Sequence, residues 1–462
     1  MVDLSLISQC PSAAGAPATR GTYPVCSDTR QYKEPSLFLA FPGARHNPLE
    51  AIGPLLRNGC PAVVFESGPV NEAIVAPLRA AHPQTTFIPV ADVVTFTQEL
   101  GTAHVRAWQR GERRVFAISG SNGKTTHKEM LAFLLEAVLG DRVVATEKNY
   151  NNHLGVPLTL LRITPQTEVC VLELGSNHPG EIKVLCDIAR PSAGLVTNIG
   201  ATHLEFFGDE SKVFEEEGYL FHAINQTTQG KGLFFQNLDD PYLARLSRSE
   251  GTETFSRGEG ADYQITPTPE GVKVAGLAHV ELVNLALTGA HNKQNMAVAW
   301  MIARRLFPAH EKAFTQAAQN FRPTRNRSEW MEHEGKKIFL DAYNANPSSM
   351  QTALEGFFDW MSVRGHKDSD AAVVLGDMNE LGDGAPDYHR QVGQYLRRWP
   401  AARVAFVGRY AAFYQEGLGG GEAFADAQAL KGSEWVRFTE GRGHIFVKGS
   451  RSLQLESLVA IT

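Results

Sequence analysis

Residues 119–126 read Ser-Gly-Ser-Asn-Gly-Lys-Thr-Thr, and they follow a short apolar run, Val115 to Ile118. A helical pattern, Lys128 to Leu139, comes after them. Glycines let backbone N–H groups approach phosphate oxygens, and a helix N-terminus adds partial positive charge. The lysine can reach the outer phosphates, and a threonine hydroxyl can ligate magnesium. A strand, a glycine-rich turn and a helix in this order predict a nucleotide-binding site in a parallel sheet.

This stretch departs from the standard phosphate-binding loop at one position. Ile118 lies five residues before Gly123, where the standard motif has glycine. The alternative is an ordinary glycine-rich turn between a strand and a helix. The Lys-Thr-Thr that follows Gly123 favours nucleotide binding.

Composition sets limits on the class of protein. The chain has 462 residues, too many for one core, which predicts about three domains. Its 43% hydrophobic and 20% charged residues are typical of a soluble globular protein, and the net charge of −6 gives no electrostatic case for nucleic acid or anionic membrane. The five cysteines are scattered, without a CxxC pair, which favours reduced thiols in the cytoplasm. No apolar run is long enough for a membrane span, and the N-terminus lacks the basic region of a signal peptide.

The pattern of apolar runs divides the chain into three regions, 1–112, 113–322 and 323–462. Polar stretches at 109–114 and 321–327 predict the linkers. The middle region alternates strand and helix, with strands that end at Ile118, Ala145, Leu174 and Ile199. This alternation predicts a parallel sheet covered on both faces, and the outer regions also predict α/β domains.

Polar side chains follow the predicted strands, where ligands gather in such folds. Glu173 ends an apolar strand next to the phosphate loop, a usual place for a magnesium ligand, although a capping or surface glutamate is the alternative. His203 lies in another such loop, and a lone histidine is more often structural. Asn149, Asn151 and Asn152 follow a third strand, where turn formation is the alternative role. The run 341–347, DAYNANP, could face the phosphate loop across a cleft or could be a capping turn.

Several stretches together resemble the Mur ligases, ATP-dependent amide ligases of peptidoglycan precursor synthesis. GSNGKTT is similar to their short phosphate loop, and further similar stretches run along nearly the whole chain. They are TEKNYNNHLGVPLTLL, ELGSNHPGEI, VTNIGATHLEFFG, NLDD, GAHNKQNMAVA, DAYNANPSSM, LGDMNELG and VKGSR. YNANPSSM and GDMNELG are most similar to the ligase that acts last in the series. The resemblance implies a three-domain fold, with a central P-loop ATPase domain between an N-terminal substrate domain and a C-terminal Rossmann-like domain.

The resemblance also implies a reaction and its participants. The last ligase joins D-alanyl-D-alanine to UDP-N-acetylmuramoyl-tripeptide through an acyl phosphate, with ATP and Mg²⁺, in a monomeric enzyme. The phosphate site would comprise Gly120, Ser121, Asn122, Gly123, Lys124, Thr125 and Thr126, with Asn292 and Asn295 beside the adenine and Arg327 and Asp341 at ribose and phosphate. Lys124, Glu173 and His203 would be catalytic; Thr125 with Glu173 would hold one magnesium and His203 would help hold a second. The substrates would meet Asp28, Thr29 and Arg30 at the uridine, Asn149, Asn151 and Asn152, and Asn344, Asn346 and Ser349 at the dipeptide.

Two positions depart from the family pattern. Where the family has a lysine whose carbamylated side chain binds magnesium, this chain has Glu217, fourteen residues after His203. A glutamate would supply the carboxylate without carbon dioxide, and a solvated acidic face is the alternative. In the first region, residues 43–50 lack the Asp and His of the family stretch. This difference keeps open an amino-acid or polyglutamate ligase with another substrate; a non-catalytic ATP-binding scaffold is the second alternative.

Overall fold

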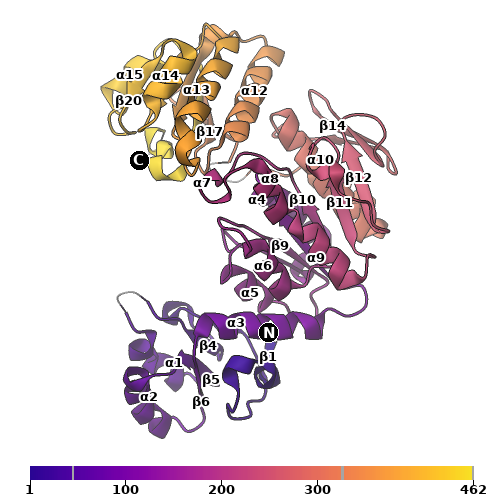
Figure 1. The fold of residues 1–462 in the computed structure, drawn as a ribbon, viewed down its shortest axis with the longest axis vertical. Coiled ribbons are helices and arrows are strands. Elements are labelled where there is room, and N and C mark those ends of the chain that lie inside the picture. Colours follow the sequence, from indigo (N-terminus) through magenta and orange to yellow (C-terminus); the bar gives the residue numbers. More distant parts are fainter. Residues whose placement is uncertain (44–45, 324–326, 460–462) are drawn as a thin grey trace.

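The computed structural model describes residues 1–43, 46–323 and 327–459, and Figure 1 shows three α/β units along its longest axis. The stretches 43–50 and 321–327, which the sequence singled out, therefore lie partly outside the described residues. Within the described ranges, no helix is both long and apolar enough to cross a membrane. All five cysteines are free thiols, and Cys170 is fully buried.

The first unit is a parallel four-stranded sheet with helices on both faces. The strand order is β3-β4-β5-β6, with β3 Val25–Cys26, β4 Leu37–Ala40, β5 Ala62–Glu66 and β6 Thr86–Val90. Alternate side chains of these strands pack against α1 (Gly53–Arg57) and α2 (Pro69–Ala81) on one face and against α3 (Val93–Trp108) on the other. A separate strand pair, β1 (Val2–Asp3) and β2 (Thr22–Tyr23), precedes the sheet.

Helix α3 joins the first unit to the second. Its Phe96 and Leu100 lie in the core of the first unit, whereas Val105 and Trp108 lie in a core of the central unit. Figure 1 shows the helix along the boundary between the two units. The indole of Trp108 donates to the carbonyl of Thr167 at 2.9 Å, which anchors the end of the helix to the central unit.

The central unit is a nine-stranded sheet of order β15-β14-β13-β12-β11-β10-β7-β9-β8. Its strands are β7 Arg114–Ser119, β8 Val143–Ala145, β9 Val169–Glu173, β10 Ala193–Val196, β11 Leu233–Asn237, β12 Thr252–Ser256, β13 Tyr263–Pro267, β14 Gly271–Gly276 and β15 Val280–Val283. One face packs against α4 (Lys124–Leu139), α10 (Ala290–Leu306) and α11 (Glu311–Ala318), and the other against α5 (Gly155–Leu160), α6 (Glu181–Ala189) and α9 (Tyr219–Thr228). The predicted parallel sheet is present, but only β7 to β10 had been predicted; β11 to β15 had not, and β14 runs antiparallel to both of its neighbours, β13 and β15.

Two predicted boundaries differ from the structure by more than one residue. Helix α4 begins at Lys124, four residues before the predicted start, because the phosphate loop leads directly into its first turn. Strand β10 ends at Val196 rather than Ile199. The backbone N–H of Ile199 donates to the Asp240 carboxylate at 2.7 Å instead of continuing the sheet.

The third unit is a six-stranded sheet of order β16-β17-β21-β18-β19-β20. The strands are β16 Glu329–His333, β17 Lys336–Asp341, β18 Ala371–Gly376, β19 Arg403–Val407, β20 Glu422–Phe424 and β21 His444–Lys448, and only β16 is antiparallel. Helices α12 (Pro347–Val363), α13 (Ala385–Tyr395) and α14 (Ala411–Leu418) cover one face and α15 (Ser433–Thr439) the other. The α/β organisation predicted for this region is present, with β16 and β20 at the two edges of the sheet.

Candidate active site between the central and third units

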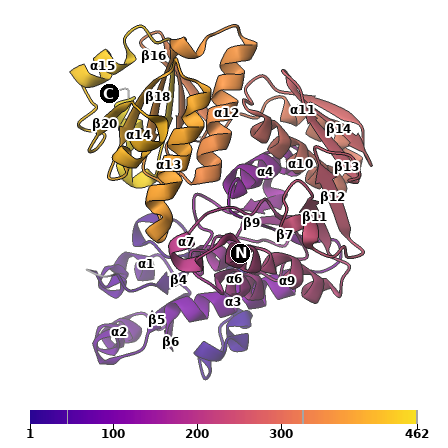
Figure 2. The same ribbon diagram turned by 45° about the horizontal axis from the view of Figure 1, so that its top comes forward.

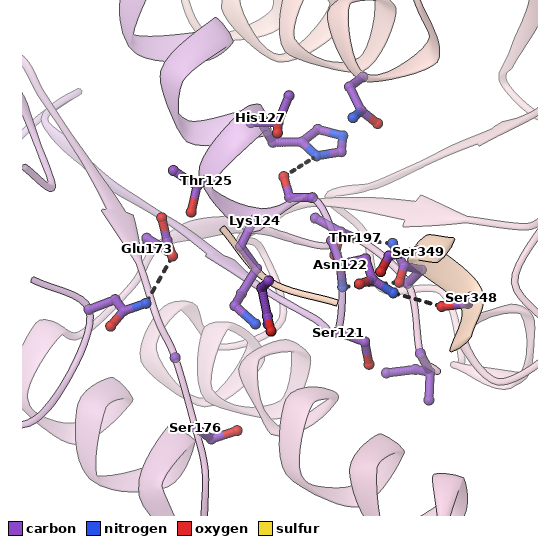
Figure 3. Close-up of a pocket in the computed structure, with 18 of the residues that line it drawn as sticks. Ser121, Asn122, Lys124, Thr125, His127, Glu173, Ser176, Thr197, Ser348 and Ser349 are labelled. Atoms are coloured by element: carbon purple, nitrogen blue, oxygen red, sulfur yellow. Dashed lines mark hydrogen bonds between the residues drawn. The ribbon is translucent and has the colours of Figure 1, made fainter. Parts of the chain in front are cut away.

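A cavity of about 1040 Å³ lies between the central and third units. The loops after β7, β9 and β10 line it from one side, and the residues after β17 and the start of α12 line it from the other. Figure 3 shows part of the lining, with the side chains of Lys124, Thr125 and Glu173 near one another. The carboxyl ends of parallel strands lie at the same edge of a sheet, which explains why residues distant in sequence meet here.

Two glycines of the phosphate loop adopt positive φ angles, a backbone conformation that glycine adopts readily. Gly123 caps α4 with φ of 79°, in the left-handed region, and the first N–H groups of the helix have no intrahelical partner. Gly120 has φ of 118°, and a Cβ there would lie 2.3 Å from the Thr197 hydroxyl oxygen. The side chain of Asn198 accepts from Asn122 N–H at 3.2 Å and holds the turn from outside. The loop is therefore shaped to present backbone N–H groups to an anion.

Lys124 and Glu217 form a buried pair behind this loop. Nζ of Lys124 donates to the Gly120 carbonyl and lies 3.9 Å from Oε1 of Glu217. The Glu217 carboxylate also accepts from Gly120 N–H at 2.7 Å and from the Ser176 hydroxyl at 3.2 Å. Only 1% of the residue is exposed, so the alternative of a solvated acidic face is wrong at this position. Burial arises because α8 (Glu210–Glu217) ends against the loop.

Glu173 presents one free carboxylate oxygen to the cavity. Its Oε1 accepts from the Asn151 amide at 2.8 Å, whereas its buried Oε2 has no hydrogen-bond partner. The residue is 3% exposed and lines the cavity together with Thr125. An unpartnered buried carboxylate oxygen is costly unless a ligand completes it, so this position fits a hard cation such as Mg²⁺.

The asparagines before α5 have different structural roles. Asn151 orients Glu173, as described, and Asn152 accepts from Gly155 N–H at 2.9 Å at the start of α5. Asn149, Asn151 and Asn152 all line the cavity. Turn formation and cavity lining are therefore combined in the same short stretch.

The start of α10 forms a further wall of the cavity. Asn292 is buried and donates to the Thr288 carbonyl at 3.1 Å, and Asn295 lies beside Gly123. His127 and His291 also line this part, and burial lowers the pKa of each to about 4. Both imidazoles are consequently neutral near pH 7, which leaves this end of the cavity without their positive charge.

The third unit contributes a buried ion pair. Lys448, at the end of β21, donates to the Asp341 carboxylate at 2.6 Å and to the Asn344 carbonyl at 2.9 Å. Lys448 is 2% exposed and Asp341 faces the cavity from the end of β17. The guanidinium of Arg327 lies 3.8 Å from the ring centroid of Tyr343. This pair and the stacked arginine bring charge from the third unit to the site.

Asn346 connects the third unit to the phosphate loop. Its Oδ1 accepts from Ser349 N–H at 2.9 Å as the cap of α12, and its amide donates to Oδ1 of Asn122 at 2.7 Å. Ser348 accepts from the Asn122 amide at 2.9 Å, a contact visible in Figure 3. The predicted capping turn is thus present, and it also contacts the nucleotide loop across the two units.

His203 lies at the rim of the cavity, in the left-handed region with φ of 51°, and begins α7 (Leu204–Phe207). Among the described residues, no group of three or more His, Cys, Asp or Glu side chains is close enough to hold one metal ion. The structure therefore keeps Glu173, His203 and Glu217 at separate positions around the loop.

Most of the predicted site residues line this one cavity. They are Ser121, Asn122, Gly123, Lys124, Thr125, Thr126, Asn149, Asn151, Asn152, Glu173, His203, Asn292, Asn295, Arg327, Asp341, Asn344 and Ser349. The others do not line it: Gly120, Glu217 and Asn346 lie behind its surface, and Asp28, Thr29 and Arg30 belong to the first unit. There, Arg30 pairs with Asp28 at 2.8 Å.

Sequence analysis assigned no role to several residues of the cavity wall. Lys448, His291, Asp239 and Arg257 are the main ones. Lys448 was within the quoted VKGSR, His291 within GAHNKQN and Asp239 within NLDD, so the motifs contained three of them. Arg257 had no such signal, because only the fold brings the loop after β12 to this edge of the sheet.

Comparisons with known proteins agree with this arrangement. Residues 118–303 match the model of the Mur ligase middle domain, and residues 326–450 match that of the Mur ligase, glutamate ligase domain. A Bacillus subtilis protein named UDP-N-acetylmuramoyl-tripeptide–D-alanyl-D-alanine ligase is 30% identical over 85% of this chain and 81% of its own length. The chain belongs to the Mur ligase family. An Escherichia coli protein of the same name is 30% identical over 94% of this Mur ligase and 92% of the relative.

Solved structures agree on the fold of this Mur ligase. MurF from Acinetobacter baumannii superimposes with a TM-score of 0.79 at 24% identity, over 99% of this chain and 98% of that one. MurF from Thermotoga maritima, solved in complex with ADP, has a TM-score of 0.74 at 23% identity, over 95% and 96%. The predicted three-domain α/β fold is confirmed, and the protein is a ligase.

Proposed function

We propose that this Mur ligase joins D-alanyl-D-alanine to UDP-N-acetylmuramoyl-tripeptide at the expense of ATP, in peptidoglycan precursor synthesis. The observation that carries the proposal is the single cavity in which the phosphate loop faces Asp341, Asn344 and Ser349. Two relatives named UDP-N-acetylmuramoyl-tripeptide–D-alanyl-D-alanine ligase, each 30% identical over most of this chain, support the choice of substrates.

The nucleotide would bind with its phosphates on residues 120–126. The N–H groups at the start of α4 and the Lys124 ammonium offer positive charge there. Asn292 and Asn295 would lie by the adenine, and Arg327 and Asp341 would approach ribose and phosphate from the third unit. The Thermotoga maritima structure, solved in complex with ADP, supports the binding of an adenine nucleotide by a protein of this fold.

Magnesium fits the free oxygen of Glu173. Glu173 and Thr125 would hold one ion, and His203 with Glu217 would serve a second, directly or through water. When bound, such ions would neutralise the charge of triphosphate and carboxylate. The buried, unpartnered Oε2 of Glu173 is the feature that supports this assignment.

The proposed reaction brings two negatively charged groups together, the substrate carboxylate and the triphosphate of ATP. A substrate carboxylate attacks the γ-phosphorus, an acyl phosphate forms and ADP leaves. The amine of the dipeptide then attacks the carbonyl carbon, loses a proton, and inorganic phosphate leaves. Lys124 would stabilise the transferring phosphoryl group, and the contact of Asn122 with Asn346 and Ser348 would keep the third unit over the site and exclude water from the acyl phosphate.

The substrates would enter from different domains. Asp28, Thr29 and Arg30 of the first unit would bind the uridine part. Asn149, Asn151 and Asn152 would contact the peptide of the nucleotide-linked substrate, and Asn344, Asn346 and Ser349 the dipeptide. A UDP-linked substrate and free thiols support a cytoplasmic protein, and the family supports a monomer.

The proposed domain boundaries are 1–112, 113–322 and 323–462. The strand β7 begins at Arg114, directly after the first boundary, and β16 begins at Glu329, shortly after the second. Helix α3 is the element that both the first and the central core share.

A phosphate-release assay tests the proposal. We expect release from ATP only when UDP-N-acetylmuramoyl-tripeptide and D-alanyl-D-alanine are both present, with a product of the summed mass less water. Release with an amino acid or glutamate in place of the dipeptide would assign a different acceptor. ATP binding without release under every condition would identify a non-catalytic scaffold.

A further inference from the structure

The motif LGDMNELG, residues 375–382, has no role in the function proposed above. It begins with the last two residues of β18 and then reaches across to the central unit, where Figures 1 and 2 show α7 beneath the third unit. The carbonyl of Glu380 accepts from Glu205 N–H at 3.2 Å. The backbones approach so closely at Gly382 that a Cβ there would lie 3.2 Å from Cα of Glu205.

Within this contact, the Glu380 carboxylate meets the imidazole of His203. Oε2 lies 2.5 Å from Nδ1, although the two groups are not aligned as a well-formed hydrogen bond. Only 15% of the His203 side chain is exposed. Catalytic contacts are commonly misaligned in free enzymes and tighten when substrates bind.

Both residues are held in an uncommon backbone conformation. Glu380 has φ of 62° and His203 has φ of 51°, in the left-handed region that few residues other than glycine adopt. Such conformations persist where the surrounding structure determines them, and they gather at functional sites. The pairing therefore joins two constrained residues from different domains.

The rest of the motif fixes the position of Glu380. Met378 N–H donates to Nε2 of the buried His389 at 3.1 Å, and Asn379 N–H donates to the Ser450 hydroxyl at 3.0 Å. The Asp377 carboxylate accepts from the N–H groups of Arg409 and Tyr410 at 2.8 and 2.9 Å. These hydrogen bonds fix the backbone of the loop to the third unit and thereby fix the position of Glu380.

We propose that Glu380 is a positioning residue for His203, supplied by the third domain. Its carboxylate accepts a hydrogen bond from Nδ1–H, so that the proton stays on Nδ1 and Nε2 keeps its lone pair for a cation or a substrate group. A carboxylate on one ring nitrogen sets the tautomer and orientation of a ligating histidine and increases its basicity. Because the two residues belong to different domains, His203 has its working tautomer only while the domains are in contact. This inference rests on the role proposed for His203.

The alternative is a contact that only holds the two domains together. Three substitutions separate the two roles: Glu380→Ala removes the carboxylate, Glu380→Gln keeps an acceptor oxygen without charge, and Glu205→Gln is the control. Glu205 lies on the other side of the same contact, and its exposed side chain makes no hydrogen bond or ion pair among the described residues. Glu205→Gln therefore changes the same charge without touching His203.

The first measurement is the tautomer of His203 by nitrogen NMR of histidine-labelled protein without metal, with the signal assigned by its loss in His203→Gln. We expect the Nδ1–H form in the native chain and in Glu205→Gln, and a mixture in Glu380→Ala. Glu380→Gln should lie between them, and it reports on the pairing even if Glu380→Ala fails to fold. An unchanged tautomer in both Glu380 variants would overturn the proposal.

The second measurement is the magnesium concentration for half-maximal phosphate release. We expect Glu380→Ala to raise it on the order of 10–100-fold, the effect typical of removing the partner of a metal-ligating histidine. An increase equal to that of Glu205→Gln would contradict the proposal. Failure of the proposed function gives a different result: the native chain would release no phosphate with the dipeptide, while the tautomer would still respond to Glu380.

Discussion

Replacing Lys124 with methionine should have separate effects on catalysis and stability. Lys124 lies between the Gly120 carbonyl and the Glu217 carboxylate, and 14% of its side chain is exposed. Methionine preserves the length of the side chain but removes the charge that would meet the transferring phosphoryl group. We expect turnover to be abolished, a loss on the order of 3 kcal/mol or more of transition-state stabilisation.

The effect on stability follows from the distance to Glu217. Two unit charges about 4 Å apart attract by roughly 4 kcal/mol at the effective dielectric constant of a protein. Glu217 keeps the Gly120 N–H and the Ser176 hydroxyl in the variant, which limits the loss. We therefore expect the free energy of unfolding to fall by about 2–3 kcal/mol, or a melting temperature lower by roughly 4–12 °C for a domain of this size.

A second substitution distinguishes the two effects. Lys124→Met combined with Glu217→Gln removes both charges, so the double variant should recover most of the lost stability and none of the activity. Calorimetric melting and phosphate release would be measured on the native chain, both single variants and the double variant. The reasoning fails if Lys124→Met retains turnover, or if the double variant is less stable than Lys124→Met alone.

Four further predictions follow from the same contacts. Glu173→Gln should raise the magnesium requirement at least on the order of tenfold, because its free oxygen becomes a neutral amide; unchanged magnesium titration would exclude it as a ligand. ATP with substrate should compact the protein in X-ray scattering, and Asp341→Ala should weaken this response; identical native profiles with and without ligands would contradict closure. Activity should be independent of bicarbonate, and Glu217→Gln should increase the need for magnesium; stimulation by bicarbonate would contradict the idea that Glu217 supplies the carboxylate. Burial lowers the pKa of His389 to about 4, below its ordinary value near 6.5, so between these pH values the unfolded chain binds a proton that the folded chain does not. The free energy of unfolding should therefore fall as the pH falls through this window. Calorimetry should show a shallower fall for His389→Gln.

Local pattern was sufficient for much of the fold. The apolar runs before Lys124 and Glu173 predicted β7 and β9, since a buried parallel strand requires an unbroken run of apolar residues. Strands β11 to β15 of the central sheet and the edge strands β16 and β20 of the third sheet were not predicted. The apolar pattern is weaker in the edge strands β15, β16 and β20, because their side chains are partly exposed.

The sequence by itself determined the phosphate loop and the chemical types of its neighbours. Gly123, Lys124 and Thr125 are consecutive, and a loop of this kind needs only local geometry to be recognised. Which distant residues meet that loop was decided by tertiary structure alone. Glu217 lies behind Lys124, and Asn346 bonds to Asn122 across two domains, because helix packing and domain contact bring together segments that no spacing relates. Burial also had to be read from the fold. Glu217 belongs to an acidic run that looks solvated in sequence, but it forms a desolvated ion pair with Lys124 because α8 ends against the phosphate loop.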